Sequence, residues 1–160
     1  MNQINVLFVC LGNICRSPMA EGIFKKVIER EGLQNKITIN SAGTARYHIG
    51  KDPDSRATHV CAQNDIVLQH KGQQILSIDL EKQDYILAMD SSNFQDIESL
   101  ICVGKKNAAV FLMRDFDLQN KGADVPDPYY GGEDGFYEVF GMLERSSYEL
   151  LRYIRMEHSI

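Results

Sequence analysis

Two reactive side chains lie close together near the start of the chain, Cys10 and Arg16, with five residues between them. A cysteine thiolate is a strong nucleophile, and the planar guanidinium of arginine can bind two oxygens of a phosphate group at once. A candidate acid, Asp127, precedes Pro128, which restricts the backbone of the residue before it. Asp-Pro is also a common turn, so both interpretations of Asp127 stay open here. These residue types suit transfer of a phosphoryl group to sulfur, with a proton donated to the leaving group.

The residues between these two side chains favour a loop that binds an oxyanion. An apolar run over Asn5–Val9 predicts a buried strand, and Ser17-Pro18 predicts a helix start with proline at its first position. Such a loop points backbone N–H groups at one centre, and the helix dipole adds positive charge there, which should stabilise the cysteine thiolate. Gly12 allows close approach of the backbone, and Asn13 tolerates a left-handed conformation. A nucleotide-binding P-loop is excluded, because no Gly-Lys-Ser/Thr follows the glycine.

Composition and charge exclude several other classes of protein. The 160 residues fit a single domain, 1–160, with 44% hydrophobic and 24% charged residues. A net charge of −5 argues against a general nucleic-acid binder and leaves attraction for an anionic substrate to a local field. No apolar run reaches the length of a membrane span, and no signal-peptide pattern is present. The four cysteines, at 10, 15, 61 and 102, show neither zinc spacing nor the density of a disulfide scaffold, so a reducing cytoplasm is expected.

The elements that must position these groups alternate between strands and helices. Apolar and alternating runs predict strands at 5–9, 37–41, 85–89 and 108–113. Apolar stripes predict helices at 19–30, 53–64, 93–103 and 136–156, with a short helix after 77 and a long loop over 114–133. This order predicts an α/β fold, a doubly wound domain whose four-stranded parallel sheet is flanked by helices. Ligands bind at the carboxyl ends of such strands, and the loop after Cys10 begins at one of them.

Four stretches resemble motifs of one known family. The run Val9–Glu21, VCLGNICRSPMAE, resembles the signature loop of the low-molecular-weight protein tyrosine phosphatases. Ser41–Thr44, Asp84–Asp90 and Asp127–Tyr130 follow in the family's order and spacing, so the resemblance covers essentially the whole chain. It implies a Rossmann-like fold and an enzyme that hydrolyses protein phosphotyrosine through a cysteinyl-phosphate intermediate, with no metal and no cofactor.

By this resemblance each candidate residue has a role. Cys10 is the nucleophile, and Asp127 is the general acid of the first step and the general base of the second. Ser17 donates a hydrogen bond to the sulfur and is also compatible with a helix N-cap. Asp90 pairs with the signature arginine, and Ser41 and His70 hold the strained backbone of the loop asparagine. The phosphate-binding loop comprises Leu11, Gly12, Asn13, Ile14, Cys15, Arg16 and Ser17.

Aromatic and apolar side chains are expected to form a slot for a flat ring. The adjacent Tyr129 and Tyr130 would form one wall, and Tyr47 lies where the family places the opposite aromatic side chain. Ile14, at the apex of the loop, would narrow the slot, whereas a related branch that acts on phosphoarginine carries threonine at this position. The expected substrates are phosphotyrosine proteins, strongly preferred over phosphoserine proteins, with little activity on phosphoarginine.

Cys15 is a second thiol in the loop, five residues after the first. It could be simply a small buried hydrophobic residue. The family, however, protects its nucleophile by a disulfide with a nearby thiol. The resemblance therefore favours a reversible bridge between Cys10 and Cys15 under oxidation.

Two other functions remain open on the residues alone. A thiol-dependent arsenate reductase shares the fold and the Cys-x5-Arg loop but needs a closely spaced downstream cysteine pair, and only Cys61 and Cys102 remain. A phosphocarrier module would accept phosphate on its cysteine without an acid or a signature arginine. The phosphatase hypothesis also predicts inhibition by phosphate, vanadate and similar oxyanions, and a monomer or weak dimer without nucleic-acid or membrane partners.

Overall fold

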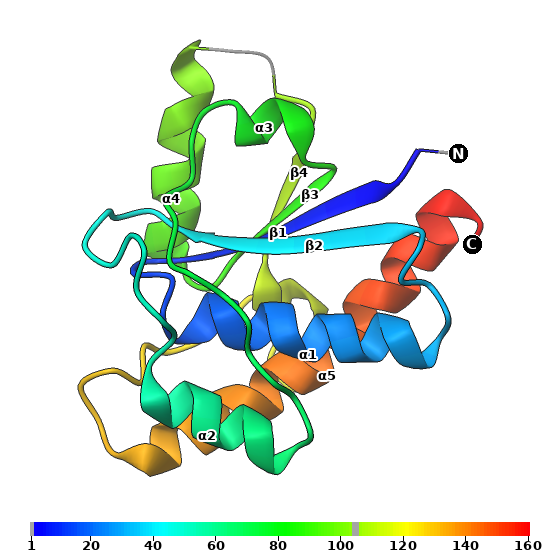
Figure 1. The fold of residues 1–160 in the computed structure, drawn as a ribbon. Helices are drawn as coiled ribbons and strands as arrows, with labels where there is room; N and C mark the ends of the chain where they lie inside the picture. Colours follow the sequence, from blue (N-terminus) through cyan, green and yellow to red (C-terminus); the bar gives the residue numbers. More distant parts are fainter. Residues whose placement is uncertain (1, 104–105) are drawn as a thin grey trace.

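A four-stranded sheet forms the centre of the fold (Figure 1). All strands are parallel, in the order β2-β1-β3-β4: β1 (Ile4–Cys10), β2 (Ile37–Gly43), β3 (Tyr85–Ala88) and β4 (Ala109–Leu112). The computed structural model describes residues 2–103 and 106–160. The predicted α/β class with four parallel strands is confirmed.

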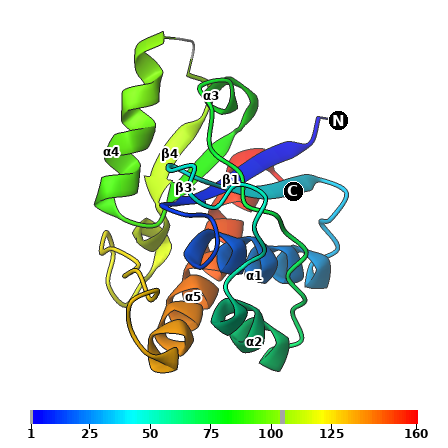
Figure 2. The ribbon, with the colours of Figure 1, turned by 60° about the vertical axis from the view of Figure 1, so that its left-hand side comes forward.

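Helices cover both faces of the sheet. On one face lie α1 (Arg16–Arg30), α2 (Ser55–Gln63) and α5 (Glu133–His158), with α1 packed against α5 (Figures 1 and 2). On the other face lie α4 (Ser91–Ser99) and the short α3 (Asp79–Lys82). Two 3-10 helices, Leu100–Val103 and Met113–Phe116, follow α4 and β4. None of the helices in 2–103 and 106–160 combines the length and the apolar character needed to cross a membrane.

The alternation of side chains along β1 explains why this strand is central. Val6, Phe8 and Cys10 belong to the core beneath α1 and α5, whereas Leu7 and Val9 belong to the core beneath α3 and α4. Successive side chains of a strand point to opposite faces, so a strand buried on both faces needs an uninterrupted apolar run. Each of these five side chains is at most 2% exposed. This burial fixes the place where the chain leaves the sheet with Cys10.

Several element boundaries differ from the predictions. α1 begins at Arg16, so Pro18 is its third residue and not its first. Proline is tolerated there because the first four N–H groups of a helix have no partner within it. The helix predicted over 93–103 is α-helical only to Ser99 and continues as a 3-10 helix. α5 starts at Glu133, ahead of its predicted range, and a 3-10 helix occupies the start of the predicted long loop.

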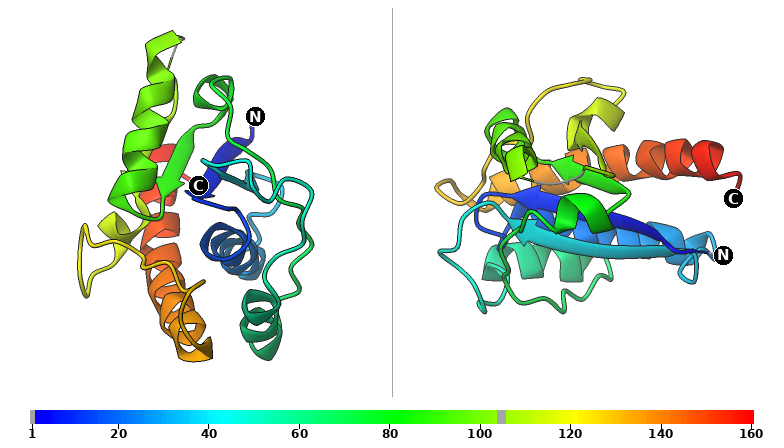
Figure 3. Two further views of the ribbon diagram at one scale, coloured as in Figure 1. Left: turned by 90° about the vertical axis from the view of Figure 1, so that its left-hand side faces the viewer. Right: turned by 90° about the horizontal axis from the view of Figure 1, so that it is seen from above.

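Three connecting segments meet at the carboxyl edge of the sheet, away from both chain ends (Figure 1, left). Seen from that edge, the loop after β1 lies between the loop over 44–54 and the segment over 117–132 that leads into α5 (Figure 3, left panel). In parallel sheets, ligand sites form at this edge. The sheet therefore brings the predicted loop and the predicted acid, which are far apart in sequence, to one side of the molecule.

Candidate active site

The loop between β1 and α1 has the backbone conformation of an anion-binding turn. Asn13 has a φ of 57°, in the left-handed region, a conformation that asparagine tolerates. Within the described residues, the backbone N–H groups of Gly12, Ile14 and Cys15 have no hydrogen-bond acceptor. Together with the amino terminus of α1, these groups are free to bind an oxyanion.

Cys10 lies at the base of this loop, where β1 ends. Its Sγ lies 2.9 Å from Ser17 Oγ and accepts a hydrogen bond from the Asn13 N–H at 3.3 Å. Ser17 Oγ itself accepts from Asn13 Nδ2 at 2.8 Å, and its own hydrogen has the sulfur at 2.9 Å and the more distant carbonyl of Ala42 at 3.5 Å as acceptors, so the shorter contact favours donation to the sulfur. Two donors therefore face the sulfur. The interpretation of Ser17 as a helix N-cap is wrong, because α1 already begins at Arg16 and the N-cap position is that of Cys15.

Every polar atom of the Asn13 side chain has a partner. Nδ2 donates to Ser17 Oγ and, at 3.0 Å, to Ser41 Oγ. Oδ1 accepts from the backbone N–H of Gln73 at 2.9 Å and lies 2.6 Å from His70 Nε2. These bonds hold a left-handed backbone that costs free energy in a residue with a side chain. Gln73 was not predicted, because its contribution is a main-chain N–H that every residue type except proline has.

Glu21 is a buried carboxylate that the sequence analysis missed. It accepts a hydrogen bond from the Ser41 hydroxyl at 2.8 Å, lies 3.4 Å from His70 Nδ1 and pairs with Lys25 at 2.6 Å. Burial lowers the pKa of the His70 imidazole, and the Glu21 carboxylate opposes that shift. The available signal was the spacing of Ser17 and Glu21, which places them on one face of a helix.

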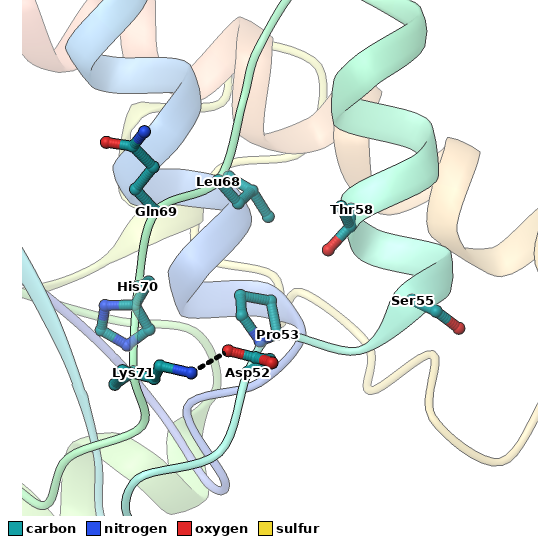
Figure 4. A pocket seen from close by; sticks show the side chains of 8 residues that line it. All are labelled: Asp52, Pro53, Ser55, Thr58, Leu68, Gln69, His70 and Lys71. Carbon is teal, nitrogen blue, oxygen red and sulfur yellow. Dashed lines mark hydrogen bonds and ion pairs between the residues drawn. The ribbon is translucent and has the colours of Figure 1, made fainter.

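A hollow of about 650 Å³, larger than the cavity of about 290 Å³ that Cys10 lines, lies between the start of α2 and residues 68–71 (Figure 4). His70 lines it, and Lys71 and Asp52 form an ion pair within it. Its lining contains neither a cysteine nor an arginine, so it lacks the nucleophile and the guanidinium expected for transfer of a phosphoryl group to sulfur. In the part of the chain that the structure describes, no three His, Cys, Asp or Glu side chains form a metal-binding group. Volume alone therefore does not identify the site.

Arg16 is held from several directions. Its Nη1 donates to Asp90 Oδ2 at 2.6 Å and to the carbonyl of Val125 at 3.0 Å, and its Nη2 lies 3.7 Å from Asp127 Oδ2. Asp90 is the N-cap of α4 and accepts from the Asn93 N–H at 2.7 Å through its other oxygen. The pair between Arg16 and Asp90 that the resemblance implies is present, whereas the contact with Val125 was not foreseen.

A cavity of about 290 Å³ joins the cysteine, the arginine and the acid. Tyr129 and Tyr130, in edge-to-face contact with ring centroids 5.0 Å apart, lie on one part of its lining, and Tyr130 is 90% exposed. All four predicted slot residues line this cavity, together with His48, whose role in the lining was not predicted. The full lining is Cys10, Leu11, Gly12, Ile14, Cys15, Arg16, Tyr47, His48, Asp127, Tyr129 and Tyr130.

The other cysteine side chains differ from Cys10 in their surroundings. Burial raises the pKa of the Cys15 thiol far above its ordinary value, so this side chain stays protonated at neutral pH. Burial also raises the pKa of Cys61 to about 12. The side chain of Cys102 lies outside the described residues. Cys15 lines the cavity while Cys61 is fully buried, so of these two described thiols Cys15 is the one that shares a space with the predicted nucleophile.

The chain is similar to known phosphatases over nearly its whole length. A family model described as low molecular weight phosphotyrosine protein phosphatase matches residues 5–159. A protein of that description from Schizosaccharomyces pombe is 42% identical over 153 residues, which cover 95% of this chain and 97% of the yeast protein. A protein tyrosine phosphatase from Entamoeba histolytica, known from its crystal structure, is 40% identical in sequence to this chain. The two structures match with a TM-score of 0.90 over 98% of this chain and 99% of that chain. A Drosophila arginine phosphatase is 30% identical, with a TM-score of 0.89 over 94% and 97% of the two chains.

Proposed function

The chain belongs to the low molecular weight phosphotyrosine protein phosphatase family and is a phosphatase, and we propose that it hydrolyses protein phosphotyrosine through a phosphorylated Cys10. One observation carries the proposal: Cys10, Arg16 and Asp127 line the same cavity of about 290 Å³. A nucleophile, a cation for the phosphate oxygens and a proton donor are the groups that this reaction needs.

In the first step, the Cys10 thiolate attacks phosphorus. The sulfur–phosphorus bond forms while the bond from phosphorus to the tyrosine oxygen breaks. Arg16 and the N–H groups of the loop bind the non-bridging oxygens, whose charge they match. Asp127 gives its proton to the departing phenolate, an effect worth roughly 10²–10⁴-fold in rate.

In the second step, water hydrolyses the cysteinyl phosphate. The Asp127 carboxylate takes a proton from the water molecule while the water oxygen bonds to phosphorus. The sulfur–phosphorus bond breaks in the same step. Cys10 leaves as a thiolate, which the Ser17 hydroxyl at 2.9 Å stabilises by a hydrogen bond. Inorganic phosphate is released, and the enzyme returns to its starting protonation state.

The slot supports phosphotyrosine as the substrate. Ile14 and the rings of Tyr47, Tyr129 and Tyr130 line the cavity above Cys10 and suit a phenyl ring. Phosphoserine is too short to reach the sulfur while its backbone stays outside. The Drosophila arginine phosphatase has nearly the same fold, so the fold itself does not decide between the two substrates, and we assign the expected preference against phosphoarginine to the apolar side chain of Ile14. Phosphate and vanadate should compete with substrate, because they would occupy the same oxyanion site.

Membership in the family favours this function over the two alternatives. A thiol relay, as in an arsenate reductase, needs accessible downstream cysteines, and Cys61 is fully buried. A phosphocarrier needs no acid beside its phosphate site, whereas Asp127 lines the cavity. Turnover of an aryl phosphate, without arsenate reduction in the presence of thioredoxin, would separate the three functions.

The intermediate can be trapped directly. We expect rapid mixing with excess 4-nitrophenyl phosphate, denaturation within milliseconds and peptide mapping by mass spectrometry to place one phosphate on the peptide that contains Cys10. A burst of nitrophenol equal to the enzyme concentration should accompany it. Cys61→Ser is the matched control and should give the same burst. A normal rate of turnover with no phosphate on Cys10 would contradict the proposed mechanism.

A further inference from the structure

Arg56, in the first turn of α2, joins that helix to the segment that carries Asp127. Its Nε and Nη2 donate to the two carboxylate oxygens of Asp54 at 3.0 and 2.9 Å. Its Nη1 donates to the carbonyl of Gly131 at 3.1 Å, and its Nη2 donates also to the carbonyl of Tyr129 at 3.0 Å. Arginine has five N–H donors in one plane, and four contacts from this plane fix the orientation of the guanidinium.

Two aromatic rings further restrict this guanidinium. Arg56 Cζ lies 4.6 Å from the ring centroid of Phe136 and 5.6 Å from that of Tyr129. Phe136 is fully buried near the start of α5, so it provides a rigid surface. Cation–π contacts of this kind add to the hydrogen bonds at a partly exposed position. Arg56 is therefore a fixed connection and not a freely moving surface side chain.

Asp54 extends the connection to the phosphate loop. Its backbone N–H donates to the carbonyl of Ile14, at the apex of that loop, at 2.8 Å. Its carboxylate also accepts from the Arg56 backbone N–H at 2.9 Å as the N-cap of α2. The side-chain hydrogen bonds of Arg56 hold the pKa of the Asp54 carboxyl below its ordinary value. A short series of contacts thus runs from Ile14 through Asp54 and Arg56 to the carbonyls of Tyr129 and Gly131.

The acid segment, defined as residues 126–131, depends on these contacts. Within the described residues, the only hydrogen bonds between this segment and the rest of the chain are the two that Arg56 donates. The other bonds are internal, including that from the Tyr129 N–H to Asp127 Oδ1 at 3.1 Å. The ion pair between Asp127 and Arg16, at 3.7 Å, is longer than a hydrogen bond. Asp127 is therefore carried by a small turn whose far side is attached to α2 by one side chain.

We propose that Arg56 is a positioning residue that sets the place of the Asp127 carboxyl over the leaving group. This inference rests on the proposed function, since it takes Asp127 to be the acid. Without the two bonds to the carbonyls, the turn can move away from the cavity and take the carboxyl with it. A misplacement of about 1 Å can cost on the order of 10²-fold in rate, even when the altered residue lies away from the chemistry.

The test compares leaving groups. Arg56→Met keeps an apolar stem over Phe136 and removes every donor. We expect kcat/KM on phenyl phosphate to fall roughly 10–100-fold, and kcat/KM on 4-nitrophenyl phosphate to fall less than about 3-fold, because a good leaving group needs little help from an acid. In an Asp127→Asn background, Arg56→Met should cause no further loss on phenyl phosphate, because the group that it positions is already absent.

Two further variants keep the test decisive. Arg56→Lys retains the charge beside Asp54 but cannot reach both carbonyls with a fixed plane, so it should show the same leaving-group dependence with a smaller loss. If Arg56→Met does not fold, Arg56→Lys decides the question alone. His59→Gln is the matched control, since His59 Nε2 lies 3.6 Å from Glu133 Oε1 in an exposed pair that joins α2 to α5 without touching the acid segment. It should leave both substrates unaffected.

The outcomes separate this proposal from the proposed function. Equal losses on both substrates in the Arg56 variants would overturn the positioning role, even with a normal leaving-group dependence in Asp127→Asn. An additive loss in the Arg56→Met, Asp127→Asn double variant would also overturn it. A rate loss in Asp127→Asn itself that does not depend on the leaving group would instead contradict the acid role of Asp127, and with it the premise of this inference.

Discussion

The phosphate loop and the acid segment are built in opposite ways. In the loop, Asn13, Arg16 and Ser17 are at most 2% exposed, and their side chains bond to several other elements. In the acid segment, the Asp127 side chain is 34% exposed, Tyr130 is almost fully exposed, and the only hydrogen bonds to the rest of the described chain come from Arg56.

This difference matches the two tasks that the proposed mechanism gives to these regions, which are oxyanion binding and proton transfer. Donors that stabilise charge on phosphate work best when they are fixed before the substrate arrives, because no reorganisation is then needed during reaction. An acid that later acts as a base must also exchange protons with water, so it lies where water reaches it. Rigid burial therefore belongs to oxyanion binding, and exposure on a lightly attached turn belongs to proton transfer.

The largest effect is expected when the proposed nucleophile is removed. Cys10→Ser should lower kcat by about 10⁴-fold or more, because a serine hydroxyl is not ionised at this site. Binding of phosphate or vanadate, measured by calorimetry, should persist because the donors of the loop remain. Arg16→Lys should lose both binding and rate, since a point charge replaces a planar fork. Substantial steady-state turnover by Cys10→Ser would contradict the role of Cys10 as the nucleophile.

Asp127→Asn should separate rate from binding. We expect kcat/KM to fall by roughly 10²–10⁴-fold with phenyl or alkyl leaving groups and least with nitrophenyl phosphate, while phosphate affinity stays nearly unchanged. A series of aryl phosphates of graded leaving-group pKa measures this dependence. If the loss were the same across the series, Asp127 would have a structural role and the comparison of the two regions would fail.

Oxidation should affect the phosphate loop alone. We predict that peroxide forms a disulfide between Cys10 and Cys15 that dithiothreitol reduces with recovery of nearly all activity, because a nearby thiol captures the sulfenic acid before further oxidation. Cys15→Ser should lose activity irreversibly under the same treatment. Peptide mapping measures the bridge, Cys61→Ser serves as the control, and the absence of a bridge would leave Cys15 a small buried residue.

A smaller effect, on substrate preference, is expected at Ile14, which lines the same cavity as Tyr129 and Tyr130. Ile14→Thr exchanges an apolar group at the slot for a hydroxyl and should shift the ratio of kcat/KM on phosphotyrosine to kcat/KM on phosphoarginine by about 10-fold toward phosphoarginine. Matched peptides carrying each phosphorylated residue measure the ratio. Comparable values for both substrates in the unaltered protein would overturn the phosphotyrosine preference and leave only a general phosphatase.

The smallest effect on rate is expected at Asp117, where the segment before the acid begins. Asp117 is fully buried between Arg114 at 3.0 Å and Arg145 at 3.1 Å. Burial raises its pKa, but hydrogen bonds from Arg145, the Gln119 N–H and Arg114 outweigh this, and the pKa lies below its ordinary value of 3.8. Asp117→Asn should lower the free energy of unfolding by about 3 kcal/mol at pH 7, with little change in kcat.

The lowered pKa of Asp117 also makes the free energy of unfolding depend on pH. A depressed carboxyl pKa gives stability that is fully present well above pH 3.8 and is lost as the pH falls through the lower, folded-state pKa. Urea unfolding at pH 7 and pH 3 should show a larger loss of stability on acidification in the unaltered protein than in Asp117→Asn. Equal losses in the two proteins would contradict the pairing as the source of the shift.

The sequence by itself predicted the strand segments and the phosphate loop, because each leaves its signal in a short run of neighbouring residues. An uninterrupted apolar run predicts a strand buried on both faces, and Cys-x5-Arg with Gly12 and Asn13 predicts an anion-binding turn at its end. The left-handed conformation of Asn13 is one that its residue type tolerates. Helix starts were less certain, as Pro18 shows, because proline is tolerated throughout the first turn.

Only the tertiary structure decided which distant groups hold the site together. Val125 acts through a carbonyl that every residue has, so no residue type marks it. Glu21 appears in sequence as an ordinary helix charge until Ser41 and His70 pack against it. Arg56 meets its acceptors 73 and 75 residues further along the chain, at main-chain carbonyls of a loop. Contacts of this kind depend on how elements pack, and packing is a property of the whole fold and not of any short stretch of sequence.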